Sequence, residues 1–118
     1  MKKVILDTDF IINAVKNKID VGTEIKSLIL DKTQISYLDQ TIKELKGKPF
    51  EALTLNLIKK FKPIKTKQDK SVDNLILDLI RDKKDIIIAT QDKNLKEKLK
   101  KGKISVITIR QQKYLILS

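Results

Sequence analysis

Four acidic residues of this 118-residue sequence stand where their side chains could act together in catalysis: Asp7, Glu44, Asp73 and Asp92. Asp7 directly follows the apolar run at 4–6, and Asp92 follows the apolar run at 86–89 after two further residues. Both runs are expected to be buried parallel strands, whose carboxyl ends meet at the edge of an open α/β sheet where ligands bind. Glu44 and Asp73 lie on helical segments expected to reach the same edge, so the sequence predicts that the four carboxylates converge.

A cluster of bare carboxylates is unfavourable, because the charges repel one another and lose hydration on burial. A divalent cation removes this cost. Mg²⁺ and Mn²⁺ prefer oxygen ligands, and such an ion lowers the pKa of a bound water and stabilises charge on a phosphate. The acids therefore indicate a Mg²⁺ or Mn²⁺ site suited to phosphodiester hydrolysis, with Thr8, Asp9 and Thr90 as supporting neighbours.

Each acid also has an ordinary structural interpretation. Asp7 could simply end its strand, Asp73 and Asp92 could lie at helix starts, and Glu44 could pair with Lys48 one helical turn later. An unpartnered carboxylate after a buried strand is costly, so Asp7 favours a functional role most strongly. The remaining aspartates are expected at helix ends and on solvated faces: Asp20, Asp31, Asp69, Asp78, Asp82 and Asp85.

The composition narrows the chemistry further. The chain has 26 Lys and Arg against 15 Asp and Glu, a formal net charge of +11. This surplus favours a polyanionic partner such as RNA, although a Lys-rich surface also serves solubility. The chain has no Cys and no His, which excludes disulfides, thiol nucleophiles, Ser-His-Asp catalysis and zinc sites built on these residues. Catalysis must rest on carboxylates, hydroxyls, Lys, Tyr or a metal held by oxygen atoms.

Short apolar runs alternate with helical patterns along the chain. Strands are expected at 4–6, 34–37, 86–89 and 104–109, with a brief extended piece at 63–64. Helices are expected around 10–15, from Gly22, from Asp39 to Gly47, from Pro49 at its first position through Phe61, from the N-cap Ser71 through Ile80, and from Asp92 to Gly102. The apolar tail 114–117 is expected to pack back on the domain. This alternation predicts one α/β domain over 1–118, with a mostly parallel central sheet flanked by helices.

Four blocks of the sequence resemble, in order, the acidic blocks of the PIN domain family: VILDTDFI at 4–11, IKEL at 42–45, VDNLI at 72–76 and IATQD at 88–92. The resemblance implies a PIN-like three-layer sandwich and a metal-dependent endoribonuclease acting on single-stranded or structured RNA. It further implies metal coordination by Asp7, Asp73 and Asp92, with Glu44 as a further acid and Thr90 as a supporting hydroxyl. The sequence departs from the family at Asp9, where Asn is common; this residue could be a further ligand, a neighbouring group or a helix cap.

The role within the family is left open by the sequence. Segment 109–115 is similar to the ending of small archaeal proteins related to Fcf-type nucleases, which process ribosomal RNA. VapC-type toxins usually lack this ending, but a toxin ribonuclease and a non-cleaving RNA-binding scaffold both stay open. So does another enzyme class, because Asp7-Thr8-Asp9 is similar to the opening motif of haloacid-dehalogenase-type phosphatases. The chain is short for that fold and lacks its paired-Asp block.

No apolar run is long enough to be a membrane span or a signal segment, so a cytoplasmic protein is expected. The expected partner is RNA, with ribosomal RNA as one option. PIN proteins often pair, and the apolar tail could serve a homodimer.

Overall fold

The computed structural model of the protein describes residues 1–81 and 85–118, so Asp82 lies outside the described residues. Within these ranges one sheet has the strand order β3-β2-β1-β4-β5-β6. The strands are β1 (Lys2–Leu6), β2 (Thr33–Leu38), β3 (Lys62–Ile64), β4 (Ile86–Ala89), β5 (Ser105–Arg110) and β6 (Tyr114–Leu117). All neighbouring strands are parallel except β6, which is antiparallel to β5. The mostly parallel α/β sheet is confirmed, and the tail expected only to pack back on the domain is a sixth strand.

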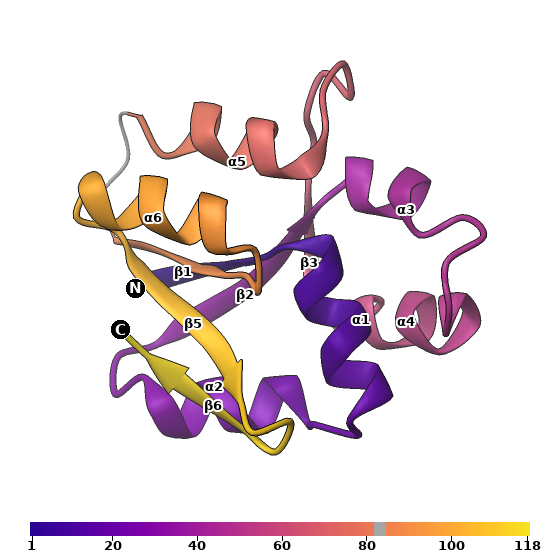
Figure 1. Ribbon diagram of the computed structural model, residues 1–118, viewed down its shortest axis with the longest axis horizontal. Helices are drawn as coiled ribbons and strands as arrows, with labels where there is room; N and C mark the ends of the chain where they lie inside the picture. Colours follow the sequence, from indigo (N-terminus) through magenta and orange to yellow (C-terminus); the bar gives the residue numbers. More distant parts are fainter. Residues whose placement is uncertain (82–84) are drawn as a thin grey trace.

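Helices cover both faces of this sheet (Figure 1). They are α1 (Thr8–Lys16), α2 (Val21–Leu28), α3 (Gln40–Glu44), α4 (Glu51–Ile58), α5 (Val72–Leu79) and α6 (Lys93–Lys101). In the view of Figure 1, α5 and α6 lie above the sheet, α2 lies below it, and α1, α3 and α4 lie on the right. The predicted three-layer sandwich is therefore confirmed.

The apolar core is divided by the sheet into two clusters. Val4 and Leu6 pack with Phe10 and the residues of α1, α2 and α4, whereas Ile5 packs with Ile76 and the residues of α5 and α6. Successive strand residues point to opposite faces, so a strand covered on both faces must be apolar at every position. This explains the continuous apolar runs at 4–6 in β1 and 86–89 in β4.

The strand order creates a crevice between β1 and β4. From β1 the chain passes through α1 and α2 on one face to reach β2, and from β4 it passes through α6 on the other face to reach β5. Connections that leave neighbouring strands toward opposite faces open a crevice at the carboxyl ends of those strands. The Asp7 backbone N–H donates to the Ala89 carbonyl oxygen across this junction, at 2.9 Å. The segment after β4 is thus held directly beside the segment after β1.

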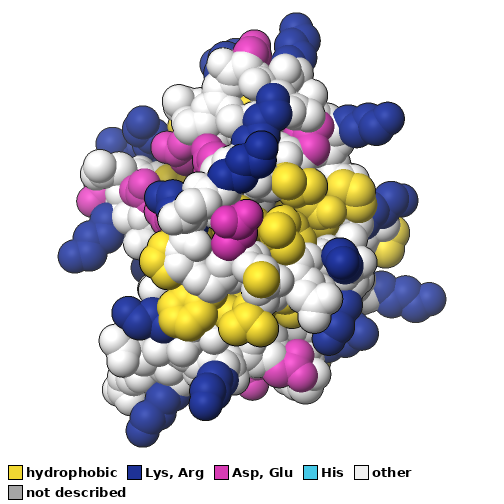
Figure 2. Space-filling view, turned by 90° about the vertical axis from the view of Figure 1, so that its right-hand side faces the viewer, with side chains coloured by type: hydrophobic (Ala, Val, Ile, Leu, Met, Phe, Trp, Pro, Cys, Tyr) yellow, Lys and Arg dark blue, Asp and Glu magenta, His cyan; other side chains and the backbone are white. Residues whose placement is uncertain are grey.

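Helix α4 differs from the prediction. It begins at Glu51, with Phe50 as its N-cap in a left-handed conformation (φ 62°), so Pro49 is not its first residue. The apolar spacing of 50–61 would place Phe50 and Leu53 on one face with Ile58, but Phe50 and Leu53 are 42% and 60% exposed while the buried face centres on Thr54 and Ile58. Such a short helix can pack against the domain with one side only. Because the apolar residues of α4 are distributed around the helix axis, some of them remain exposed. Figure 2 shows the resulting apolar surface on this side of the molecule, with basic side chains around it.

None of the helices in the described ranges has the length and apolar character needed to cross a membrane.

The turn between β5 and β6 is built from residues poorly suited to its backbone. Gln111 and Gln112 adopt positive φ angles of 53° and 57°, and the Lys113 N–H donates to the Arg110 carbonyl oxygen at 3.1 Å. Two central residues with positive φ define a type I′ turn, for which Asn followed by Gly is preferred. Side chains with a Cβ raise the energy of this conformation.

Replacing both residues, as Gln111→Asn with Gln112→Gly, is expected to raise the free energy of unfolding by about 1 kcal/mol, because the turn loses its backbone strain. Thermal and urea unfolding monitored by circular dichroism would measure the change. The matched control is Gln111→Ala with Gln112→Ala, which keeps the strain and should give no gain. Equal midpoints for the Asn-Gly variant and this control would contradict the prediction.

Candidate active site

Asp7 stands at the end of β1 and also begins α1. Its backbone is extended (φ −74°, ψ 149°), and its Oδ1 accepts a hydrogen bond from the Thr8 N–H at 2.9 Å, as an N-cap does. Its Oδ2 accepts a hydrogen bond from the Thr90 hydroxyl at 2.7 Å. The side chain is only 6% exposed. Asp9, which the sequence left open as the cap of this helix, lies instead in the first turn and is exposed.

The environment of Asp7 opposes its negative charge. Burial raises the pKa of its carboxyl group, the hydrogen bonds from Thr90 and Thr8 lower it, and repulsion from Asp9 and Asp73 raises it again. The net result is a pKa of about 6 rather than 3.8. At neutral pH the folded protein therefore holds a buried carboxylate that two neighbouring acids repel, which is the condition that a bound cation would relieve.

The Thr90 hydroxyl connects Asp7 to Asp92 through two hydrogen bonds. The Thr90 hydroxyl proton is donated to Asp7, and the Thr90 Oγ1 atom accepts from the Asp92 N–H at 3.1 Å. Asp92 caps α6, as predicted, because its Oδ1 accepts from the Leu95 N–H at 3.0 Å. Its other carboxylate oxygen accepts no hydrogen bond from a described residue. Thr90 thus positions the carboxylate of Asp7 and the backbone of Asp92 at once.

On the other side of Asp7, the Thr8 hydroxyl leads to Glu44. It donates to the Glu44 Oε1 atom at 2.9 Å, so its 3.1 Å contact with the Thr41 hydroxyl must be one in which Thr41 donates. The Glu44 Oε2 atom accepts from the Val72 N–H at 2.9 Å. Glu44 forms no ion pair with Lys48, so the surface-pair interpretation of Glu44 is wrong.

Glu44 caps α5 from outside that helix. Ser71 occupies the N-cap position as predicted, but its side chain makes no capping hydrogen bond. The carboxylate of Glu44 satisfies the Val72 N–H instead, where the helix dipole also favours a negative charge. Asp73 follows Val72 in the first turn, half-buried, and its carboxylate accepts no hydrogen bond from any residue in the described ranges.

The structure therefore brings the predicted residues together at one edge of the sheet. An unbroken series of hydrogen bonds runs from the start of α6 to the start of α5, and Asp9 and Asp73 are close enough to Asp7 to raise its pKa. The residues in this arrangement are Asp7, Thr8, Asp9, Glu44, Asp73, Thr90 and Asp92. Sequence reasoning missed Thr41, which is fully buried. Its position three residues before Glu44, on the same side of a helix, was the available signal.

The donor set suits a hard divalent cation. The chain has 26 Lys and Arg, yet within the described ranges none forms an ion pair with these acids. Carboxylate oxygens left without a cation are the ligands that Mg²⁺ and Mn²⁺ prefer. Among the described residues no three acidic side chains are arranged as a formed metal cage, so the metal ligands stay a prediction.

Several aspartates outside this site have the structural roles expected of them. Asp20 caps α2 by accepting from the Thr23 N–H, and Asp78 and Asp85 pair with lysines at the surface.

The fold and the site define a class of protein, an α/β domain with an acidic crevice where two central strands diverge. A family model described as a PIN-like domain matches residues 4–112, and the chain belongs to this family. It is 35% identical over 125 aligned positions to ribonuclease VapC4 of Methanocaldococcus jannaschii, covering 97% of this chain and 95% of that protein. A solved structure described as the PIN domain endonuclease Utp24 superposes with a TM-score of 0.86 at 26% identity, covering 98% of this chain and 90% of the other.

The raised pKa of Asp7 predicts a specific dependence of stability on pH in the absence of metal. Because the folded protein binds this proton more tightly than the unfolded chain, the contribution of Asp7 is complete at low pH and is lost as the pH rises through about 6. The difference between a pKa of about 6 and 3.8 corresponds to about 3 kcal/mol.

Asp7→Asn removes the charge with little change in shape, since the amide oxygen can still accept from the Thr8 N–H while the amide NH₂ group can donate to the Thr90 hydroxyl oxygen. The variant is expected to be more stable than the wild type at pH 7.5 in EDTA, with the difference shrinking as the pH falls below 6. Urea unfolding at a series of pH values would test this. A less stable variant at pH 7.5 would show that the Asp7 charge does not oppose folding.

Proposed function

We propose that this protein is a metal-dependent endoribonuclease. The observation that carries the proposal is the buried Asp7 carboxylate, which two neighbouring acids repel at the crevice between β1 and β4. The relatives support it, since one is named a ribonuclease and the other an endonuclease. The basic surplus of the chain supports a polyanionic substrate.

In this proposal Asp7, Asp73 and Asp92 hold Mg²⁺ or Mn²⁺. The ion, when bound, supplies an acidified water and stabilises negative charge on the phosphate. Glu44 is the further acid that could add an oxygen ligand, and its carboxylate also fixes Thr8 and the start of α5 by accepting one hydrogen bond on each oxygen. Thr90 holds the Asp7 carboxylate in one orientation before any ligand arrives.

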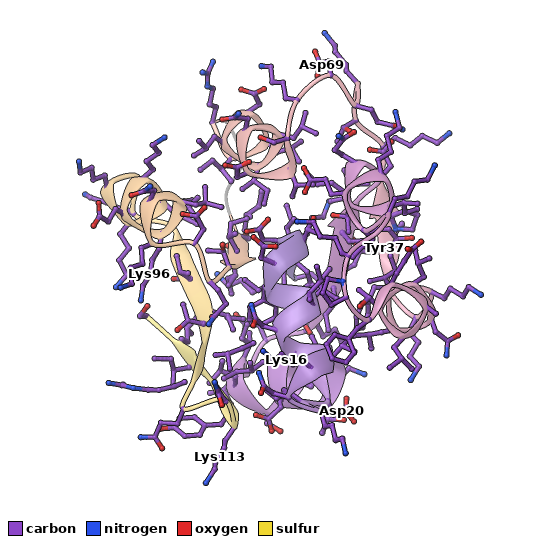
Figure 3. All side chains as sticks on the ribbon, turned by 45° about the vertical axis from the view of Figure 1, so that its right-hand side comes forward. Lys16, Asp20, Tyr37, Asp69, Lys96 and Lys113 are labelled. Atoms are coloured by element: carbon purple, nitrogen blue, oxygen red, sulfur yellow. The ribbon has the colours of Figure 1, made fainter. Side chains whose placement is uncertain are left out.

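Basic side chains flank the acids on two sides. Lys43, Lys46 and Lys48 are exposed around the end of α3, and Lys93 is exposed at the start of α6. Lys96 lies one turn further along α6 (Figure 3). Phosphate contacts of this kind position a nucleic acid without selecting its sequence. We propose that RNA, single-stranded or structured, crosses the crevice between these two groups of lysines.

Two biological roles share this chemistry. Processing of ribosomal RNA is favoured by the resemblance of the C-terminal segment 109–115 to the ending of proteins related to Fcf-type nucleases. A VapC-type toxin is favoured equally by the relative VapC4. Growth arrest on expression, relieved by the product of a neighbouring gene, would identify a toxin. Accumulation of unprocessed ribosomal RNA after deletion, without growth arrest on expression, would identify a processing enzyme.

We further propose a cytoplasmic protein that can form a homodimer. The exposed apolar side chains Ile42, Phe50 and Leu53 on α3 and α4 provide a surface for self-association. Light scattering after size-exclusion chromatography would decide between monomer and dimer.

The central test is cleavage of single-stranded RNA in the presence of Mn²⁺. The wild type is expected to cleave, and EDTA is expected to stop the reaction. Asp7→Asn is expected to lower the cleavage rate by about a hundredfold or more, because one metal ligand loses its charge. Gel analysis of end-labelled RNA fragments would measure the rates.

The matched control is Asp31→Asn, the same chemical change at an exposed acid on the opposite edge of the sheet, which should cleave as the wild type does. Mn²⁺ should also raise the thermal midpoint of the wild type and of Asp31→Asn, but not that of Asp7→Asn. Wild-type cleavage rates in Asp7→Asn would refute the assignment. Calorimetry showing no Mn²⁺ binding up to millimolar concentration would favour a non-cleaving RNA-binding scaffold.

A further inference from the structure

The connector between β3 and α5, residues 65–71, is fastened to the active-site edge by α3. At the start of the connector the Asp39 N–H donates to the Ile64 carbonyl oxygen at 3.0 Å. At its end the Val72 N–H donates to Glu44. Asp39 and Glu44 stand at the two ends of this five-residue helix, so one short element holds the connector at both ends.

The Asp39 carboxylate holds the middle of the connector as well. Both of its oxygens lie 3.1 Å from the Thr66 nitrogen, Oδ1 accepts from the Thr66 hydroxyl, and Oδ2 accepts from the Gln68 Nε2 at 2.8 Å. Burial alone would raise the pKa of Asp39, but these hydrogen bonds outweigh it and the pKa lies below the ordinary value. Asp39 was expected to open α3, and it stands at the N-cap position, but its side chain makes no capping hydrogen bond.

This fastening decides which side chains of the connector face outward. Thr66 and Gln68 turn toward Asp39 and are half-buried, whereas Lys65 and Lys67, which alternate with them, are exposed. Neither lysine forms an ion pair with a described residue. Lys70 differs, because its ammonium group pairs with Asp78 on α5 at 2.8 Å. Lys65 and Lys67 therefore carry positive charge that the described part of the protein does not neutralise.

The connector also borders a cavity against α5 that is open to solvent. The cavity has a volume of about 350 Å³, with Lys65 and Lys67 on the connector side and Leu75 and Leu79 on the helix side. Asp69 and the Lys70–Asp78 ion pair complete its lining. The connector extends outward beside α5, with Asp69 at its outer end (Figure 3). An apolar wall beside free cations suits a nucleotide, whose base avoids water while its phosphate does not.

We propose that residues 65–70 form an RNA-binding arm, in which Lys65 and Lys67 contact the backbone phosphates of the strand leaving the active site, and that Asp39 is the positioning residue of this arm. The inference rests on the proposed function for the identity of the ligand. It adds a third group of phosphate contacts, beyond those near Glu44 and Asp92. The cavity against α5 accommodates one base of the same strand.

RNA binding can be measured apart from cleavage by working in EDTA. The probe is a fluorescein-labelled single-stranded RNA of about ten nucleotides, the length that a small domain covers. Lys65→Ala with Lys67→Ala is expected to weaken binding about tenfold and to reduce the slope of log Kd against log salt by about 1.4, the value for two lost contacts. The matched control is Lys100→Ala with Lys101→Ala, at the far end of α6, which removes the same charge and should change neither quantity beyond a small general effect.

Asp39→Ala tests the positioning role. The variant is expected to raise the KM for RNA in Mn²⁺ and to reduce the salt slope while kcat stays near the wild-type value, because the catalytic acids are untouched. If Asp39→Ala does not fold, Thr66→Ala with Gln68→Ala removes the two side-chain hydrogen bonds from the connector side, keeps those of the Thr66 N–H, and should give a smaller change in the same direction. Asp39→Asn, which keeps an acceptor oxygen, should recover part of the loss in KM.

Two results would overturn the proposal. The first is equal affinity and equal salt slope for the Lys65 and Lys67 variant and its control. The second is a fall in kcat at unchanged KM on removal of the Asp39 contacts, which would assign Asp39 to the catalytic acids. Failure of the proposed function has a different signature: a wild type that binds RNA through Lys65 and Lys67 but cleaves nothing would retain the arm and exclude the nuclease.

Discussion

Repulsion among carboxylates at the end of β1 is the constraint on which the rest of the structure depends. A buried negative charge must be tied down by hydrogen bonds or matched by a cation. Here the hydrogen bonds come from Thr8 and Thr90, and no described lysine or arginine supplies the cation. At neutral pH the fold thus retains an unfavourable interaction that the removal of one charge would relieve. This is the expected pattern for a site selected for ligand binding rather than for stability.

The sheet order makes this constraint possible. In the described part of the chain, β1 and β4 are the central neighbouring strands whose following segments leave toward opposite faces, so side chains after both strands can meet without a helix between them. The Thr90 hydroxyl contacts Asp7 in this crevice, and the Thr8 hydroxyl contacts Glu44 on the other side of Asp7. Helix α3 completes the edge at both of its ends, because Glu44 caps the helix that carries Asp73 and Asp39 fastens the connector. The acids of the proposed active site and the lysines of the proposed arm are therefore positioned from the two ends of one short helix.

Local sequence patterns were enough to predict much of this arrangement. The continuous apolar runs of β1 and β4 identified central parallel strands, and the acids that follow them were thereby placed at one edge. The capping role of Asp92 could be predicted because its partner, Leu95, is three residues away. Glu44 and Asp73 were expected at that edge from the position of their helical segments, and the family resemblance, confirmed by the match over 4–112, implied the same set.

The contacts that could not be predicted join residues far apart in the chain. Glu44 and Val72 are separated by 28 residues and Asp39 and Thr66 by 27, so no short-range spacing could reveal either pair. Asp39 precedes a helix, so the sequence indicated a cap. Its side chain binds Thr66 instead, and the position of Thr66 depends on where β3 ends. The tail 114–117 was apolar enough for burial, but its pairing as a strand depends on the exposed edge of β5. Tertiary placement decided each of these cases.

The cap that α3 supplies to α5 has a consequence for spectroscopy. The Val72 amide proton points at a carboxylate on another helix, and the neighbouring residue is Asp73. The chemical shift of the Val72 amide proton and its exchange with solvent therefore depend on whether α3 and α5 are docked. This single amide signal would report, in an unmodified protein and without any substrate, whether the contact between Glu44 on α3 and the start of α5 is formed.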